Sequence, residues 1–188
     1  MYPEAGATFN LVNAFICLVP ASLSALAGGY LSDKLQKQSP MIKPQIVMLS
    51  NLLSVPFAYL AFTCTDNFWF STYMIMAHWL LSEAWYAPNM TMLQNTTSSQ
   101  NLGSVISIYC LLTTLTGVVG TSFLGQIQLE FDAVNNPEFY GASLTAMVLA
   151  SQLGCIPFFW KAGKAYEKKL ALKNEDSRIM EPGEWRDS

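Results

Sequence analysis

The stretch "GGYLSDKL", residues 28–35, ends a long uncharged run with an adjacent acid and base. No Asp, Glu, Lys or Arg lies between Ala5 and Ser32. A run of this length is enough to cross the hydrocarbon core of a bilayer, which takes about 20 mostly apolar residues. The stretch therefore predicts the point at which a membrane-spanning helix reaches the membrane surface.

The rest of the chain repeats this pattern of long uncharged segments. Of its 188 residues, 52% are hydrophobic and only 12% are charged, whereas about 25% are charged in an average soluble domain. Apart from Glu83, charged residues are absent from segments 44–65, 67–82, 84–129 and 139–160. We predict an all-α, polytopic transmembrane domain over residues 1–165 and a cytoplasmic tail over 166–188. The five predicted spans cover about residues 8–31, 44–64, 68–88, 102–124 and 140–160.

The apolar segments fit neither a soluble bundle nor a cleavable signal peptide. A soluble all-α bundle built from five uncharged segments would have almost no polar outer face. A cleavable signal peptide would need a basic residue before the first apolar run, and here none precedes it. The chain is therefore predicted to be an integral membrane protein.

The basic residues predict the orientation of the chain. All ten follow either the first span or the fifth, and Lys and Arg near spans are retained on the cytoplasmic side. Five spans place these two groups on the same side, with the N-terminus outside and the C-terminus in the cytosol. Segment 89–101, "NMTMLQNTTSSQN", then forms an uncharged cytoplasmic loop.

This loop contains two matches to the N-glycosylation sequon, Asn89-Met-Thr91 and Asn95-Thr-Thr97. Both would face the cytosol, where this modification is not made. We therefore predict that neither asparagine carries a glycan.

The opening stretch also predicts a close helix contact. An aspartate at a helix C-terminus is disfavoured by the dipole of its own helix, so Asp33 should be held by Lys34, Lys37 or the N-terminal end of a neighbouring helix. Small residues at helical spacing let another helix approach closely. Here they are Ala21, Ser24, Ala25, Gly28 and Gly29.

The same stretch resembles the loop signature G-x-L-[AS]-D-[KR] of the major facilitator superfamily. The matching residues are Gly29, Leu31, Ser32, Asp33 and Lys34, whereas residues 35–43 follow the family pattern only loosely. In that family the signature also lies between helices eight and nine of twelve, so the five spans resemble helices eight to twelve, over most of residues 7–165. Glu83-Ala-Trp85 and the glycine-rich fourth span are faintly similar to spinster-like transporters.

This resemblance implies a gating role and a missing partner. In the family, the loop aspartate docks near a helix of the opposite half, which makes Gly29, Asp33 and Lys34 the implied gating motif. Neither the N-terminal half nor helix seven is present in the sequence, and "MYPEAGATFN" begins as though in mid-domain. The chain is expected to be part of a full transporter, or else a short protein derived from one.

Glu83 is the strongest candidate for a functional residue, because a carboxylate within a span is costly and by default faces a protein interior or a cavity. Helical spacing places Trp79 and Tyr86 on the same face. This face suits an amphipathic or cationic solute, or a carboxylate that exchanges a proton during transport. Alternatively, Glu83 lies near the cytoplasmic end of its span and serves packing alone.

His78, the single histidine, lies about 140° around an α-helix from Glu83. A proton relay through both residues is therefore disfavoured. We expect His78 to hydrogen-bond the second span, through Asn51 or Ser54.

Two further segments have structural interpretations. In the fourth span Thr113, Gly117, Thr121 and Gly125 recur every four residues, which predicts a groove for helix packing or, less directly, for a ligand. After the fifth span, "KAGKAYEKKLALK" (161–173) predicts a basic amphipathic helix on anionic headgroups or a simple stop-transfer flank. Beyond Asn174 the polar tail is predicted to be disordered.

Several functional classes are disfavoured. The four cysteines lack C-x-x-C spacing, one histidine cannot build a His-rich metal centre, and no phosphate-binding loop or Ser-His-acid set is present. We therefore predict no metal site, no cofactor and no enzymatic activity. The net charge of −3 gives no reason to expect a nucleic-acid partner.

The predicted function is secondary active or facilitative transport of a small organic solute by alternating access. Its partners are then the solute, the lipid bilayer and the missing N-terminal half of the transporter. The alternative from another class is a non-transporting membrane subunit or scaffold derived from a transporter.

Overall fold

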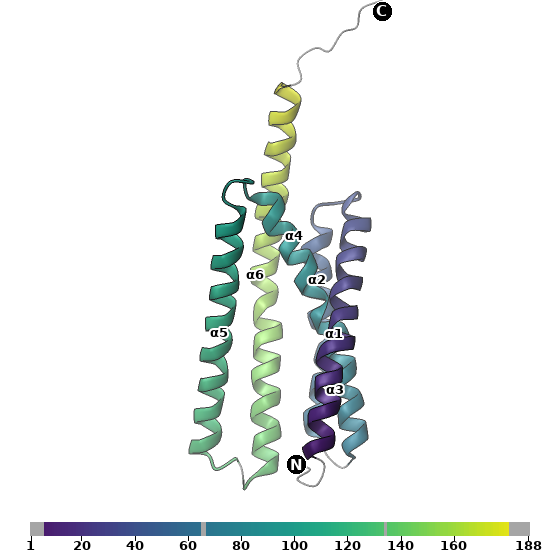
Figure 1. Cartoon of the computed structure of the whole chain (residues 1–188), viewed down its shortest axis with the longest axis vertical. Coiled ribbons are helices and arrows are strands. Elements are labelled where there is room, and N and C mark those ends of the chain that lie inside the picture. Colours follow the sequence, from purple (N-terminus) through teal and green to yellow (C-terminus); the bar gives the residue numbers. More distant parts are fainter. Residues whose placement is uncertain (1–5, 65–66, 134, 181–188) are drawn as a thin grey trace, which may run out of the picture.

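The computed structural model describes residues 6–64, 67–133 and 135–180, and its secondary structure in this part of the chain is helical throughout. The elements are α1 (Gly6–Gln36), α2 (Ile42–Thr63), α3 (Phe68–Ser82), the 3₁₀-helix η2 (Glu83–Trp85), α4 (Tyr86–Thr96), α5 (Leu102–Glu130) and α6 (Pro137–Met180). The long helices run side by side along one axis and alternate in direction (Figure 1). The predicted all-α fold is confirmed.

Four helices are long and apolar enough to cross a membrane, by length and composition: α1, α2, α5 and α6. They correspond to four of the five predicted spans and indicate an integral membrane protein. Helices α5 and α6 continue past the predicted ends, to Glu130 and Met180. Hydropathy marks only the part of a helix that crosses hydrocarbon, whereas its backbone hydrogen bonds continue into the polar flanks.

The prediction of an unbroken span at 68–88 is wrong. Helix α3 has 15 residues, or about 22 Å, which is less than the roughly 30 Å of a hydrocarbon core. It gives way to η2 at Glu83 before α4 begins at Tyr86. Pro88, in the first turn of α4, has no N–H to donate, and in an unbroken α-helix its ring would meet the Ala84 carbonyl. The break at η2 relieves this conflict.

The predicted loop at 89–101 is also largely helical, because α4 extends to Thr96 and only residues 97–101 connect it to α5. Its polar side chains find partners inside the protein. The Thr91 hydroxyl donates to the Ala87 carbonyl at 2.9 Å, and Thr96 donates to the carbonyl of Met92 at 2.9 Å. These hydrogen bonds give the threonine hydroxyls partners within the helix, although such bonds do not themselves favour helix formation.

The groove predicted on α5 has no helix against it in the described part of the chain. No atom lies within 4 Å of the position that a Cβ would take at Gly117 or Gly125. The Thr121 hydroxyl donates to the Gly117 carbonyl of its own helix, at 2.9 Å. No side chain of α5 is buried, so the predicted packing of this stripe is not found within residues 6–64, 67–133 and 135–180.

The basic segment 161–173 is neither a separate helix nor flat against the bundle. It continues α6 to Met180, and this end of α6 projects beyond all the other helices (Figure 1). The segment is rich in Lys, Ala, Leu and Glu, which favour a helix. The predicted disorder beyond Asn174 is therefore wrong for residues 175–180, and residues 181–188 lie outside the described part of the chain.

The two groups of basic residues lie at the same end of the bundle, which is called the basic end below. Gln36, in the last turn of α1, hydrogen-bonds Tyr166 of α6 at 2.9 Å. Glu130 and Glu138, which flank the α5–α6 connection, lie at the opposite end (Figure 1). Between the two basic groups the chain runs the length of the bundle four times, in α2, in α3 and α4 together, in α5 and in α6, which returns it to the same end. A cytosolic location of the basic end stays a prediction.

Candidate functional site

A cleft of about 420 Å³ lies where the helix breaks after α3. Helix α2 forms one wall, α3 and η2 form a second, and α6 forms the third. The lining residues are Asn51, His78, Trp79, Ser82, Glu83, Trp85, Val148, Ser151, Gln152, Cys155 and Phe159.

The cleft lies within the apolar length of the bundle rather than at one of its ends. Gln152 is about 22 Å along α6 from Pro137 and about 13 Å before Lys161, the first basic residue of that helix. Glu83 is a similar distance along α3 from Phe68. In a hydrocarbon core about 30 Å thick, both side chains are at membrane depth.

His78 has the partner expected for it on α2. Its Nδ1 lies 3.2 Å from the Ser54 carbonyl oxygen. A carbonyl can only accept, so Nδ1 carries the proton, and in the neutral ring Nε2 is then an acceptor.

His78 and Glu83 line the same cleft, although they lie on different faces of their helix. The 3₁₀ turn that begins at Glu83 does not bring them onto one face, because its larger angle per residue turns Glu83 further from His78. A cleft enclosed by three elements admits side chains that do not share one narrow helix face.

The predicted face of Glu83, Trp79 and Tyr86 is only partly assembled. Trp79 lines the cleft with Glu83, whereas Tyr86 is not part of the lining and is 46% exposed. Trp85 takes that place and packs edge-to-face on Tyr86, with ring centroids 5.7 Å apart. The 3₁₀ turn explains the exchange, since it rotates the residues that follow Glu83 relative to an α-helix.

Three uncharged polar residues of the cleft, Ser82, Ser151 and Gln152, were not identified from the sequence. The Ser151 hydroxyl donates to the Val148 carbonyl at 2.8 Å. Gln152 is 9% exposed, and its Oε1 has no hydrogen-bond partner. A glutamine within an uncharged span was the signal that could have indicated this wall. Asn51, named above as a partner for His78, instead donates from Nδ2 to the Val47 carbonyl at 3.0 Å.

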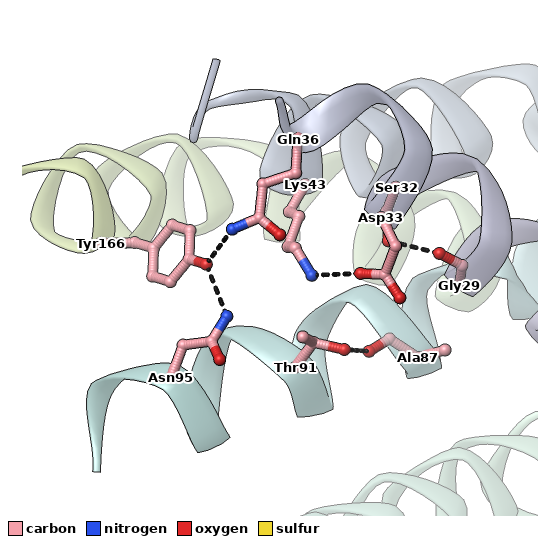
Figure 2. Close-up of polar contacts among 9 residues, drawn as sticks. All are labelled: Gly29, Ser32, Asp33, Gln36, Lys43, Ala87, Thr91, Asn95 and Tyr166. Carbon is pink, nitrogen blue, oxygen red and sulfur yellow. Dashed lines mark hydrogen bonds and ion pairs between the residues drawn. The ribbon is translucent and has the colours of Figure 1, made fainter. Parts of the chain in front are cut away.

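A second polar cluster lies at the basic end and contains Gly29 and Asp33 of the predicted gating motif (Figure 2). Asp33 accepts a hydrogen bond from Lys43 Nζ at 2.6 Å. The Lys43 side chain is fully buried, whereas that of Asp33 is 62% exposed. The expected partners Lys34 and Lys37 do not fill this role.

Lys43 replaces them because of the short connection between the helices. Helix α2 begins at Ile42, soon after α1 ends at Gln36, so the first turn of α2 lies beside the end of α1. Lys34 instead places its Nζ 5.8 Å from the centroid of the Tyr30 ring. The N-terminal end of a neighbouring helix was one of the expected locations, and Lys43 occupies it.

Tyr166 joins three helices at the basic end. Its hydroxyl oxygen accepts hydrogen bonds from Gln36 Nε2 on α1 and Asn95 Nδ2 on α4, each at 2.9 Å (Figure 2). Tyr166 itself belongs to α6 and is 3% exposed. Separating α1 or α4 from α6 at this end breaks one of these hydrogen bonds.

The predicted close approach at Gly28 and Gly29 is confirmed. A Cβ on Gly29 would lie 2.9 Å from the Ala87 Cβ, and one on Gly28 would lie 2.8 Å from the Ala84 Cα and closer still to the Ala84 carbonyl oxygen. Real Cβ atoms essentially never come within 3.0 Å of other heavy atoms. Helix α1 therefore rests on the break in the α3–α4 segment, next to the cleft.

We expect neither sequon to be glycosylated, for a reason beyond topology. Asn89 Nδ2 donates to the Tyr109 hydroxyl at 2.6 Å and Asn95 Nδ2 donates to Tyr166, both from within α4. The mobility on a gel should not change when the protein from eukaryotic cells is treated with an endoglycosidase. A sequon in a tag placed before Met1 is the positive control, and a glycan on Asn89 or Asn95 would overturn the predicted orientation.

Comparisons of the chain with protein-family models, with curated proteins and with solved structures found no significant match. The molecule is therefore described by its own geometry. It has four candidate membrane spans, a polar cleft beside a broken helix, and a polar cluster at the basic end.

Proposed function

We propose that this chain is the C-terminal part of a secondary transporter that moves a small organic solute by alternating access. The observation that carries the proposal is the helix break at Glu83 beside a polar cleft at membrane depth. Interrupted helices surround the substrate and ion sites of many secondary transporters. Non-helical backbone is tolerated at this depth only where it is buried in protein or lines a water-filled cavity.

The composition of the cleft supports a functional role. A carboxylate at this depth is costly, and such residues commonly mark solute or ion pathways. Ligand sites usually occupy about 300–1,000 Å³ and combine an apolar lining with a few polar groups. The cleft of about 420 Å³ has this character, with Glu83, His78 and Gln152 among aromatic side chains.

The cluster at the basic end supports a gating role. The loop signature that contains Asp33 resembles that of the major facilitator superfamily, where the aspartate takes part in conformational switching. Here the Asp33–Lys43 pair and the Tyr166 hydroxyl together link α1, α2, α4 and α6. Breaking these contacts would let the basic end open, while the cleft lies deeper along the same helices.

The proposal is tested by the uptake activity of the complete protein. We expect Glu83→Gln to lower the initial rate of uptake at least about tenfold, because it removes the charge that faces the cleft. Glu138→Gln, at the opposite end of α6, is the matched control and should leave the rate unchanged. Surface expression of both variants must equal that of the wild type. Unchanged uptake with Glu83→Gln would mean that Glu83 serves packing alone.

A membrane scaffold is the second candidate function, and the unburied surface of α5 favours it. The two functions predict different sizes for the native polypeptide, which an antibody to the C-terminal tail can measure on membranes from the source organism. A band of about twice the 20.8 kDa of this chain, or larger, supports the transporter. A band near 20.8 kDa supports the scaffold.

A further inference from the structure

We propose that the cleft beside the helix break binds a solute with a primary ammonium group on an aromatic or apolar body. This inference extends the proposed function, because it names the chemical class of the solute. It concerns binding alone, so it can be tested apart from transport.

Three polar side chains of the cleft use a donor within the protein. His78 donates from Nδ1 to the Ser54 carbonyl, which leaves Nε2 as the acceptor of the neutral ring. Asn51 and Ser151 also donate to backbone carbonyls of their own helices. The acceptor atoms of these three side chains are not used in these hydrogen bonds.

Two acceptors of the cleft have no partner. The Gln152 Oε1 is buried without a hydrogen-bond partner. Within the described residues no side chain forms an ion pair or hydrogen bond with the Glu83 carboxylate. No Lys or Arg is among the residues that line the cleft. The cleft therefore contains a carboxylate and a buried amide oxygen without a positive charge to match them.

A primary ammonium group supplies the missing charge and donors for these acceptors. It carries one positive charge and three N–H donors, with no acceptor to repel the surrounding oxygens. Glu83, Gln152 and the His78 Nε2 offer acceptors of the kind that it requires. An anionic solute would instead place a second negative charge beside Glu83, with no positive charge in the lining to hold it.

The aromatic lining indicates an organic cation rather than a metal ion. Trp79, Trp85 and Phe159 line the cleft, and aromatic faces attract organic cations, most strongly where water is excluded. The same rings offer an apolar surface for the body of the solute. The volume of about 420 Å³ is also much larger than an inorganic cation requires.

The test is a binding measurement with three small probes of similar shape. The full chain, purified in lipid nanodiscs, is titrated with 2-phenylethylammonium, 2-phenylethanol and 3-phenylpropionate while the fluorescence of its tryptophans is recorded. We expect saturable binding of the ammonium probe, binding of the alcohol at least about tenfold weaker, and no saturable binding of the carboxylate. This comparison needs no variant, so it does not depend on whether a variant folds.

Variants then locate the site. Glu83→Gln and Gln152→Leu should each weaken binding of the ammonium probe about tenfold or more. Gln126→Leu, on the exposed surface of α5, is the matched control for Gln152→Leu and should leave the affinity unchanged. Each variant must retain the helical content of the wild type.

Three outcomes would overturn the inference: equal affinity for the ammonium and alcohol probes, saturable binding of the carboxylate, or a saturable response to sodium chloride alone. A failure of the proposed transport function gives results that differ from these three outcomes. Binding of the ammonium probe without uptake by the complete protein would contradict transport alone. Uptake of a neutral or anionic solute, without ammonium binding, would contradict only the solute class.

Discussion

Alanine at Gly28 should destabilise the bundle, whereas alanine at Gly117 should not. A Cβ at position 28 would lie 2.8 Å from the Ala84 Cα and closer to the Ala84 carbonyl. Both are backbone atoms, so the conflict is resolved only if α1 and η2 move apart. Forcing extra atoms into a packed site typically costs about 1–3 kcal/mol, and we expect the upper part of that range.

Gly117→Ala is the matched control because it makes the same change in the interior of another helix. No atom lies within 4 Å of the Cβ position at Gly117. Alanine is favoured over glycine in a helix interior by up to about 1 kcal/mol, so this variant should equal or exceed the stability of the wild type. Denaturation of the purified chain in detergent micelles, followed by tryptophan fluorescence, measures both free energies of unfolding. Equal effects of the two substitutions would contradict the close packing of α1 on η2.

The sequence predicts the membrane-crossing helices well, because charged side chains are excluded from the hydrocarbon core however the helices pack against one another. The uncharged segments thus correspond to α1, α2, α5 and α6. The break after α3 is different. Tryptophan and leucine around Glu83 continue the hydrophobic segment, and hydropathy does not register that Pro88 leaves the Ala84 carbonyl without a helical donor. Pro88 favours the break, but a proline alone does not decide it, since Pro20, Pro56 and Pro157 lie inside continuous α-helices.

The cleft was predictable only where it carries a charge or an unusual side chain. Glu83, His78 and Trp79 lie on one segment and are conspicuous in an apolar sequence, and all three line the cleft. Gln152 and Asn51 come from other helices, and uncharged amides barely change the hydropathy of a span. Which helices meet at Glu83 depends on tertiary packing, which the sequence pattern does not contain.

The same limit applies at the basic end. The sequence indicates that Asp33 needs a cation, because of the dipole of its own helix. The nearest lysines along the chain were the natural expectation. The partner is instead chosen by the turn that brings the start of α2 back beside α1, so Lys43 is closer in space than its distance along the sequence suggests.

Asp33→Ala should lower the free energy of unfolding much more than Lys43→Met does. Asp33→Ala leaves the ammonium of Lys43 buried without its partner, since that side chain is fully buried. Leaving a buried donor without its partner costs about 1–3 kcal/mol, and more for a charged group, so we expect Asp33→Ala to lower the free energy of unfolding by about 2 kcal/mol. Lys43→Met should cost much less, because methionine fills the same apolar space and water can hydrate an Asp33 carboxylate that is 62% exposed.

The double variant with Asp33→Ala and Lys43→Met completes a thermodynamic cycle that separates burial from pairing. Because it leaves no unpaired charge, it should be more stable than Asp33→Ala alone, even though it carries one more substitution. Denaturation of the four proteins in detergent micelles provides the measurement. If Lys43→Met proved as damaging as Asp33→Ala, the cost would lie in the loss of the ion pair itself. The asymmetric burial of its two side chains would then have no energetic consequence.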